Sequence, residues 1–520
     1  MLKSLLSVGG ITLLSRLTGF LRDVVLGAIL GAGFIADAFV VAFRLPNHFR
    51  TIFGEGAFNA AYVPSYSRVL ETEGADSARR FSGQIFSLLL LSQIVVLALA
   101  WTFTPALVTL LAPGFAEDPA KFDLAVTLTR ITFPYLLCTT LDTLLSGTLN
   151  AHRCFAAAAF APVLLNLSMI AALAVVFLFP SAGHAAAAGV ALSGAAQLLL
   201  LLVASRRAGV LSSPARPRWT ADVKQFFVAL GPAIIGSAGV QIAIFADTII
   251  SSLLPTGGPS SIYYADRINQ LPIGVIGIAA GTVLLPEMSR RLAANDPGAA
   301  YHAQNRTMAI TILLSAPFCV AFLTIPHLIM RAVFVRGAFT EADADASAAV
   351  LAAYGLGLMA VVLIRSAVAS FQSTGDTRTP MMIALAAVGL NVALKIVLFK
   401  PLGASGLAFA TSAGAWINFG LLAILALRRG AMRFDATFWK IVAATAAASL
   451  ALAVVALTGQ NAAAALSRGA GFDHPVVSLC ALGLAGSAVY AVALVLMFRI
   501  LRVPMRVLLG RLRGATPAAS

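Results

Sequence analysis

Charged side chains gather near the N-terminus, between Ser15 and Pro64, within stretches that are otherwise apolar and long enough to cross a bilayer. Four are arginines and three are acids: Arg16, Arg22, Asp23, Asp37, Arg44, Arg50 and Glu55. A charge at the centre of a bilayer costs about 2.5–3.5 kcal/mol on insertion scales, so such residues usually face a wet cavity and serve function. The stretch therefore predicts one wall of a water-filled chamber with a net positive charge.

Helical spacing divides the first of these residues between two neighbouring faces. Ser15, Gly19 and Arg22 share one face, and Arg16 shares the next face with Asp23, seven residues later. The structural alternative is an ion pair that joins one of these arginines to Asp23 or Asp37. The arginines outnumber the acids, however, which favours a site for an anion.

The second half of the chain supplies a further arginine, Arg267, beside Asp266 in the segment YYADRINQLP. Adjacent residues on a helix point apart, which favours the cavity over a local pair with Asp266. A guanidinium group fits phosphate through two parallel hydrogen bonds. The charge balance therefore predicts an anionic substrate that carries phosphate.

Two isolated charges of opposite sign lie in later apolar segments, Asp247 and Lys395. A buried ion pair between their helices is the simple interpretation. Together with Asn391, one helical turn before Lys395, they could instead form a variant of a cation site. We expect the ion pair and no metal ion.

The composition places the chain in the membrane. Of 520 residues, 59% are hydrophobic and 11% charged, whereas soluble proteins have about 25% charged residues. The net charge of +15 does not indicate nucleic-acid binding, because most arginines lie in short loops between apolar segments. The first apolar segment lacks a cleavage site and is expected to be retained.

Enzyme signatures are missing from the sequence. It contains no phosphate-binding P-loop, no GxGxxG and no HExxH, and its four cysteines show no metal-ligand spacing. We therefore expect no cofactor and no use of ATP. Energy would come from the membrane potential, from a monovalent cation or from the substrate gradient.

Fourteen apolar windows predict an all-α integral membrane protein with fourteen spans. If the N-terminus is cytoplasmic, 23 of the 36 lysines and arginines fall in cytoplasmic loops or the tail, and 5 in periplasmic loops. Both termini are therefore predicted to be cytoplasmic. The windows are approximately 5–30, 35–66, 82–112, 124–149, 156–180, 185–205, 226–254, 261–288, 307–334, 346–372, 380–399, 403–427, 439–458 and 476–500.

Weak internal repeats suggest two six-helix lobes related by a pseudo-two-fold axis along the membrane normal. Asp37 matches Asp266, PSYSR at 64–68 matches PEMSR at 286–290, and the spacing from Arg153 to Asn166 matches that from Arg378 to Asn391, at offsets of 229, 222 and 225. We expect an N-lobe at 1–207, a basic cytoplasmic linker at 208–224, a C-lobe at 225–430, two further spans at 431–502 and a basic cytoplasmic tail at 503–520.

Proline and glycine interrupt the second and eighth predicted spans at corresponding places. Pro46, Gly54 and Gly56 lie in the second, and Pro272 with Gly274 and Gly277 lies in the eighth. Broken helices allow the backbone to bend around a substrate near the bilayer midplane. The interruptions therefore predict where the central site lies.

Long motifs resemble those of the MurJ (MviN) family, the bacterial lipid II flippases of the multidrug/oligosaccharidyl-lipid/polysaccharide exporter superfamily. The resemblance covers nearly the whole chain. The motifs are SRLTGFLRD, ADAFVVAFRLPN, FGEGAFNAAYVP, ITFPY, YYADR, LPIGVIG, GTVLLP, FVRGAFT at 334–340 and STGDTRTP at 373–380.

The resemblance implies a fold, a substrate and a mechanism. Spans 13 and 14 would form a lipid-facing groove that leads into the cavity between the lobes. The substrate would be lipid II, an undecaprenyl diphosphate that carries the disaccharide-pentapeptide precursor of peptidoglycan. Alternating access would move it from the cytoplasmic to the periplasmic leaflet of the bacterial inner membrane, for peptidoglycan synthesis. The oligomeric state stays open.

The resemblance also assigns roles to residues. The family's required arginines fall on Arg16, Arg22, Arg50 and Arg267, and Ser15 shares the helix face of Arg22. Some members bind sodium through carboxylates in spans 7 and 11; here Lys395 stands where the second carboxylate would be, beside Asp247. Further charged cavity positions fall on Asp37, Arg44 and Glu55.

Two other readings compete with this one. A glycan exporter of the same superfamily, such as an O-antigen flippase, also handles polyprenyl diphosphates, and only the motifs argue against it. A polyprenyl-phosphate-dependent glycosyltransferase or ligase would need a catalytic base and usually a large outer loop, and the outer loops here are short.

Overall fold

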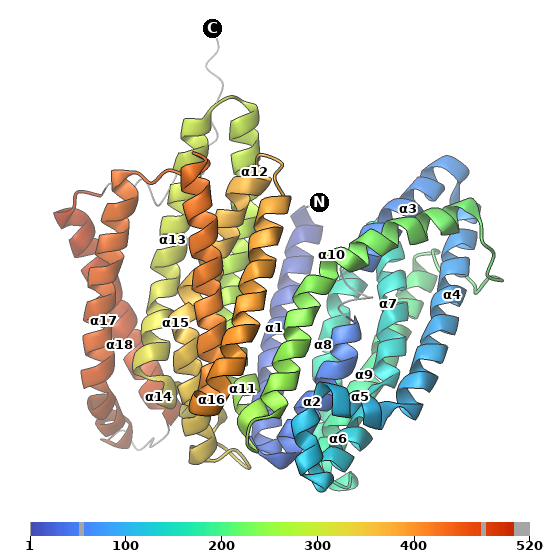
Figure 1. Ribbon diagram of the computed structural model, residues 1–520, viewed down its shortest axis with the longest axis horizontal. Helices are drawn as coiled ribbons and strands as arrows, with labels where there is room; N and C mark the ends of the chain where they lie inside the picture. Colours follow the sequence, from blue (N-terminus) through green and yellow to red (C-terminus); the bar gives the residue numbers. More distant parts are fainter. Residues whose placement is uncertain (1, 51–56, 470–474, 504–520) are drawn as a thin grey trace. The chain divides into compact units, whose positions relative to one another are not determined.

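The computed structural model describes residues 2–50, 57–469 and 475–503, and the regular structure in this part of the chain consists of helices joined by short connections, without strands (Figure 1). The first helices are α1 (Leu2–Leu30), α2 (Phe34–Arg50), α3 (Ala57–Glu73), α4 (Ala75–Thr102), α5 (Thr104–Leu111), η2 (Pro113–Glu117), α6 (Pro119–Thr132), α7 (Pro134–Ala151), α8 (Phe155–Ala174), η3 (Val176–Leu178) and α9 (Ala182–Arg207). The later ones are α10 (Ala221–Ser252), α11 (Gly258–Pro272), η4 (Ile273–Gly277), α12 (Ile278–Ala293), α13 (Pro297–Thr324), α14 (Pro326–Phe334), α15 (Glu341–Gln372), α16 (Arg378–Arg428), α17 (Ala436–Gly469) and α18 (Pro475–Ile500).

The helices form two compact units. Unit 1 comprises Met1–Tyr263 and Phe334–Asp343, and unit 2 comprises Tyr264–Val333 and Ala344–Ser520. The chain therefore passes between the units at three peptide bonds, and each of them lies within a helix: α11, α14 and α15. Unit 1 extends beyond the loop at 208–224, where the sequence places the division, because α10 packs along α3.

An aromatic core explains why α10 belongs with unit 1. Phe226 of α10 is fully buried against Phe58, Tyr62 and Phe81, with Phe58 and Tyr62 stacked at a centroid distance of 5.2 Å. The hydroxyl of Tyr62 is satisfied by Ser82 at 2.9 Å and Thr148 at 2.8 Å, which permits its burial.

Among the described residues, 10 helices are long and apolar enough to cross a membrane. One of them, α16, consists of two helices that meet at Gly403, whose φ of 56° interrupts the helical geometry, and it covers two of the predicted windows. Helices α1 and α10, with 29 and 32 residues, match two more predicted windows. The chain is thus a multi-pass all-α membrane protein.

Helix boundaries in the second half repeat those in the first. Helices α4 and α13 begin at Ala75 and Pro297 and end at Thr102 and Thr324, a difference of 222 at both ends. Helices α6 and α15 begin at Pro119 and Glu341, again 222 apart. The element order therefore supports the internal repeat that the short sequence matches suggest.

In the eighth predicted span the helix does not break but changes its hydrogen-bond pattern, and α11, η4 and α12 form one continuous span. Between α11 and α12, directly after Pro272, residues Ile273–Gly277 adopt a π-helix, which proline favours by removing a backbone hydrogen bond. In the second span, Pro46 lies inside α2, and the predicted break at Gly54 and Gly56 lies outside the described residues.

Candidate functional site

The charged cluster of unit 1 centres on Arg22 and Asp23, both on α1. The guanidinium of Arg22 donates to Asp23 Oδ1 from Nε at 3.0 Å and from Nη2 at 2.7 Å, and from Nη1 to Asn166 Oδ1 at 3.0 Å. Tyr263 of α11 donates its hydroxyl to the same Asp23 oxygen at 2.9 Å. Both side chains of the ion pair are at most 9% exposed. Arg22 is therefore held in one orientation by charge-assisted bonds.

Asn166 joins α8 to α1 below this ion pair. Its Nδ2 donates to the backbone carbonyl of Ser15 and to the hydroxyl of Thr18, both at 3.0 Å. Gly19 lies against this amide, and a Cβ there would be in ordinary van der Waals contact with Nδ2 of Asn166, at 3.4 Å. Ser15 thus contributes its carbonyl to the cluster, and one amide side chain links it to Arg22.

Arg16 and Arg44 differ from Arg22 in having no acidic partner among the residues that the structure describes. Arg16 is exposed on α1 and Arg44 half-buried on α2, and neither forms an ion pair with a residue in the described part of the chain. Because Asp23 neutralises Arg22, these two guanidinium groups add to the excess positive charge of α1 and α2, to which Lys3 and Arg50 also contribute.

Asp37 is completely buried, which differs from the water-filled cavity that the sequence predicts for it. Its Oδ2 accepts from Lys121 Nζ at 2.7 Å and from the backbone N–H of Gly257 at 2.8 Å. Its Oδ1 accepts from the backbone N–H of Ser260 at 3.0 Å and from the Ser260 hydroxyl at 2.7 Å. The carboxylate caps the N-terminus of α11 and has no lone pair left for a substrate.

Lys121 is as buried as its partner. Its side chain is 4% exposed, and Nζ lies 4.5 Å from the ring centroid of Phe115. The buried ammonium is thus neutralised by Asp37 and stabilised by an aromatic face. The charge distribution in the sequence predicts Lys121 to be one of the five cations in periplasmic loops.

In unit 2, Arg267 and Asp266 lie side by side on α11. Their closest charged atoms are 3.9 Å apart, and both side chains are about one-third exposed. Asp266 also accepts a hydrogen bond from Gln270, one turn later. Arg267 follows Tyr263 by one turn on this helix, so the two residues share a helix face.

The remaining predicted residues are described in part. The side chain of Arg50 and all of Glu55 lie outside the described residues. Asp247 and Asn391 are half-buried, and Lys395 is 3% exposed on α16. The described part of the chain holds no group of three or more His, Cys, Asp or Glu residues suited to a metal ion. The ion pair and the cation site at Asp247 and Lys395 stay predictions.

A family model matches most of this chain. The model is described as lipid II flippase MurJ and matches residues 26–471. The chain belongs to the MurJ family. A probable lipid II flippase MurJ of Rhizobium meliloti is 41% identical over 502 residues, which covers 94% of this chain and 92% of the relative. A lipid II flippase MurJ of Burkholderia cenocepacia is 33% identical and covers 82% and 84% of the two chains.

Solved structures support the same fold. A lipid II flippase MurJ in an inward closed conformation matches with a TM-score of 0.79 at 23% identity, covering 95% of this chain and 99% of that one. An inward-facing multidrug resistance MATE transporter of the MOP superfamily matches with a TM-score of 0.66 at 13% identity, covering 82% and 97%. The family consists of flippases, which are transporters and not enzymes.

Among the MurJ-like motifs, STGDTRTP forms the connection between α15 and α16. Asp376 Oδ1 accepts from the backbone N–H of Thr379 and Oδ2 from Arg429 Nη1, both at 2.9 Å. Hydrogen bonding from Thr379, followed by the charge of Arg429, holds the pKa of Asp376 below its usual value. This motif therefore has a structural role: it joins the connection between α15 and α16 to Arg429, the residue that follows α16.

Sequence reasoning missed one buried acid in this family member, Asp142. It lies on α7 and is 6% exposed, and neither carboxylate oxygen accepts a hydrogen bond from a described residue. The signal was present in the sequence, because Asp142 is the one acid inside the predicted window 124–149.

Proposed function

We propose that this protein moves lipid II from the cytoplasmic to the periplasmic leaflet of the inner membrane. The observation that carries the proposal, beyond membership in the MurJ family, is the charge distribution on α1 and α2. Arg22 is neutralised by Asp23, whereas Arg16 and Arg44 have no acidic partner among the described residues. Unneutralised guanidinium groups on membrane helices suit a diphosphate that must pass through a bilayer.

In this proposal the arginines have different roles in binding the substrate. Arg16, Arg50 and Arg267 bind the diphosphate directly, and Arg44 adds to the positive field. Arg22 is held in one orientation by Asp23 and Asn166 and belongs to the same diphosphate site. Asp37 keeps a structural role at the start of α11, because its four hydrogen bonds occupy both oxygens.

The proposed architecture has fourteen membrane crossings with both termini in the cytoplasm. Twelve crossings form two six-helix lobes, which the offset of 222 between α4 and α13 supports. Helices α17 and α18 pack side by side and have no counterpart in the first half; they would supply a groove for the polyprenyl tail. The lobes would expose the cationic cavity alternately to each side of the membrane.

The driving force in this proposal is electrical or ionic. A sequence without an ATP-binding motif leaves the membrane potential, which contributes about 2.3 kcal/mol per charge per 100 mV, or a monovalent cation. Lipid II carries its negative charge on the diphosphate, so a potential that is negative inside favours its outward movement.

The test is complementation in cells that depend on this protein as their only lipid II flippase. We expect Arg16→Ala and Arg267→Ala to abolish growth and to leave lipid II on the cytoplasmic face, measured as its inaccessibility to an impermeant lipid II hydrolase. Arg130→Ala is the matched control, because Arg130 is also an exposed arginine of a spanning helix without an ion pair to a described residue.

Normal growth of either site variant, at wild-type protein levels, would refute the assignment of these arginines. Growth arrest with a normal amount of lipid II on the outer face would instead favour export of another polyprenyl diphosphate glycan.

A further inference from the structure

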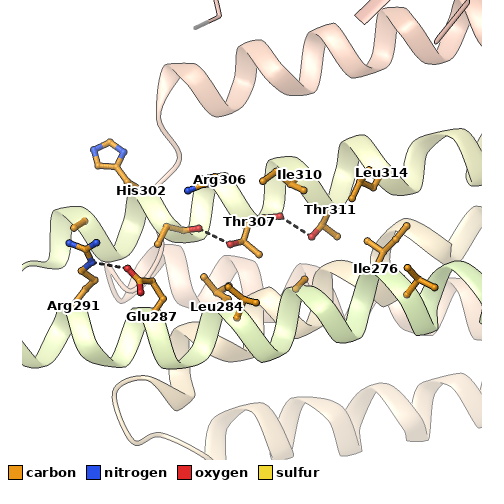
Figure 2. A pocket seen from close by; sticks show the side chains of 15 residues that line it. Ile276, Leu284, Glu287, Arg291, His302, Arg306, Thr307, Ile310, Thr311 and Leu314 are labelled. Carbon is orange, nitrogen blue, oxygen red and sulfur yellow. Dashed lines mark hydrogen bonds and ion pairs between the residues drawn. The ribbon is translucent and has the colours of Figure 1, made fainter. Parts of the chain in front are cut away.

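A groove between α12 and α13 in unit 2 contains polar groups that the protein itself satisfies. Its volume is about 800 Å³. Figure 2 shows that Arg291 donates from Nε to Glu287 Oε1, at 2.9 Å. Thr307 and Thr311 donate their hydroxyls to carbonyls of their own helix, at 2.9 and 2.8 Å. These groups therefore need no hydrogen bond from an occupant.

A cavity in unit 1 differs in this respect. It lies between α3, α4, α7 and α10, has a volume of about 490 Å³, and none of its described lining residues is charged. Most of the wall is hydrocarbon, to which Phe58, Leu136 and Leu230 contribute. Val96 lines the cavity from the spanning helix α4 and is 40% exposed. The cavity is therefore open to the bilayer and suits a neutral, apolar molecule.

Gln93 of α4 is a polar exception in this wall. It is 8% exposed, and its Oε1 has no hydrogen-bond partner in the described part of the chain. The hydroxyls of the wall are satisfied, because Ser92 donates to the carbonyl of Leu89 at 2.8 Å and Thr140 to that of Leu136 at 2.9 Å. A buried amide without a partner has lost the hydrogen bonds that it makes in water, so an occupant that restores one is favoured.

The chemistry of the wall restricts the occupant to one class of molecule. A lipid acyl chain matches the apolar wall and leaves Gln93 without a partner. A water molecule pairs with Gln93 and leaves most of the apolar volume empty. A hydroxyl group both donates and accepts, so it can pair with either the oxygen or the nitrogen of the amide. An apolar body that carries one hydroxyl therefore meets both requirements.

We propose that this cavity binds one neutral, apolar alcohol or phenol that enters from the bilayer. The hydroxyl of the ligand pairs with the amide of Gln93, and its hydrocarbon body lies between α4 and α10. The bound molecule contacts four helices of unit 1 and links α10 to α4 and α7. The site lies in unit 1 alone, so this inference does not depend on which substrate the protein transports.

The test uses the full-length protein in phosphatidylcholine nanodiscs and a photoreactive alkylphenol that carries a diazirine. After irradiation, the labelled residues are identified by mass spectrometry, and we expect them among the cavity-lining residues of α4, α7 and α10. The competitors are para-butylphenol and para-butyltoluene, in which a methyl group replaces the hydroxyl. At equal concentration in the membrane, we expect the phenol to compete about tenfold more strongly, since one buried hydrogen bond contributes about that factor.

Gln93→Leu tests the polar contact. We expect this variant to bind both competitors equally, because it keeps the apolar wall and removes the amide. Gln197→Leu is the matched control: Gln197 is also a buried amide of unit 1, 6% exposed and with its Nε2 unpaired among the described residues, but it does not line the cavity. The control should keep the preference for the phenol.

Gly231→Leu tests the apolar contact. Gly231 lines the cavity from α10, and a Cβ there would meet nothing within 4 Å, so a larger side chain fills the space without a clash. We expect this variant to lose the label in the cavity. Gly420 of α16 in unit 2 also has open space around its Cβ position, and Gly420→Leu should be labelled as the wild type is.

Two results would overturn the proposal. Equal competition by para-butylphenol and para-butyltoluene in the wild type would show that the hydroxyl is not recognised, and would assign the cavity to a lipid acyl chain. Label spread evenly over the lipid-facing helices, and unchanged in Gly231→Leu, would indicate that the probe dissolves in the bilayer and does not bind to the cavity.

Discussion

Asp37 shows how a charged residue in a membrane helix can serve structure. Its carboxylate joins α2 to Lys121 of α6 and to two backbone N–H groups at the start of α11, and both charged side chains are buried. Sequence alone placed it in a cavity, because an acid in an apolar span usually marks a wet site. Its ion-pair partner Lys121 is 84 residues away in the sequence, at a position that the sequence analysis assigned to a loop between two spans.

Removing one partner of this buried pair should destabilise the protein strongly. We expect Lys121→Met to lower the free energy of unfolding by about 3–5 kcal/mol, because it leaves the Asp37 charge without its cation. The measurement is the midpoint of thermal unfolding in detergent. The double variant Asp37→Asn, Lys121→Met should be less destabilised than the sum of the single changes; additive effects would contradict the pairing.

Asp376 provides a pH-dependent contribution outside the membrane-spanning segments. Because its folded pKa is depressed, its contribution to stability is present above the unfolded pKa of about 3.9 and is lost as the pH falls through the lower folded value. We expect the unfolding midpoint of the wild type to exceed that of Asp376→Asn at pH 7, and the difference to shrink as the pH falls below about 4. A constant difference across that range would rule out this contribution.

The ion pair between Arg22 and Asp23 illustrates what helical spacing leaves undecided. Adjacent residues point apart at Cα, yet the long arginine side chain returns to Asp23 at 2.7 Å because Asn166 and Tyr263 hold the two groups from the other side. The sequence offers this pair as the alternative to a free cation. The residues that favour the ion pair, Asn166 and Tyr263, come from α8 and α11. No local sequence pattern indicates that these two helices contact α1.

At the scale of elements, two glycines fix the contact between the end of α1 and the segment 334–340. Gly31 and Gly337 have φ of 67° and 58°, and the backbone N–H of Ala338 donates to the carbonyl of Ala28 at 2.7 Å. A Cβ on Gly337 would lie 2.2 Å from that carbonyl oxygen. This explains the glycine within the FVRGAFT motif.

We therefore expect Gly337→Ala to destabilise the protein more than Gly375→Ala. Gly375 also has a positive φ, 84°, but a Cβ there meets nothing within 4 Å. The control should cost only the left-handed backbone penalty of about 1–2 kcal/mol. Gly337→Ala adds a steric clash and should lose the Ala338 hydrogen bond, seen as a lower unfolding midpoint. Equal costs would argue against this contact.

Apolar length predicts the helices well and their interruptions less well. The windows recover the positions of the long helices, because the bilayer requires about 20 apolar residues per crossing. They do not show that 82–112 and 307–334 each break into a long and a short helix, at Phe103 and Ile325. The prolines that begin the short helices, Pro105 and Pro326, were the available signal.

At the scale of the whole molecule, the proposed topology predicts which loops face the cytoplasm. Cys154 is exposed in the turn between α7 and α8, beside the cytoplasmic Arg153 of the positive-inside pattern. In a variant that keeps only this cysteine, we expect a membrane-impermeant maleimide to react in inverted vesicles and not in intact spheroplasts. Lys400→Cys in the cysteine-free protein is the control and should show the reverse. The opposite pattern would invert the topology.

In the alternating-access cycle proposed above, any movement of unit 1 against unit 2 would have to pass through the three places where the chain joins them. None of them is a flexible linker: they fall at Tyr263–Tyr264, Val333–Phe334 and Asp343–Ala344, within α11, α14 and α15. A hinge made of helix resists torsion through its intact backbone hydrogen bonds, so a change of angle must be absorbed by bending. The π-helical turn after Pro272 lies close to the first passage and is the softest place for it. Stiffening that turn should slow the transport cycle without weakening the affinity for substrate.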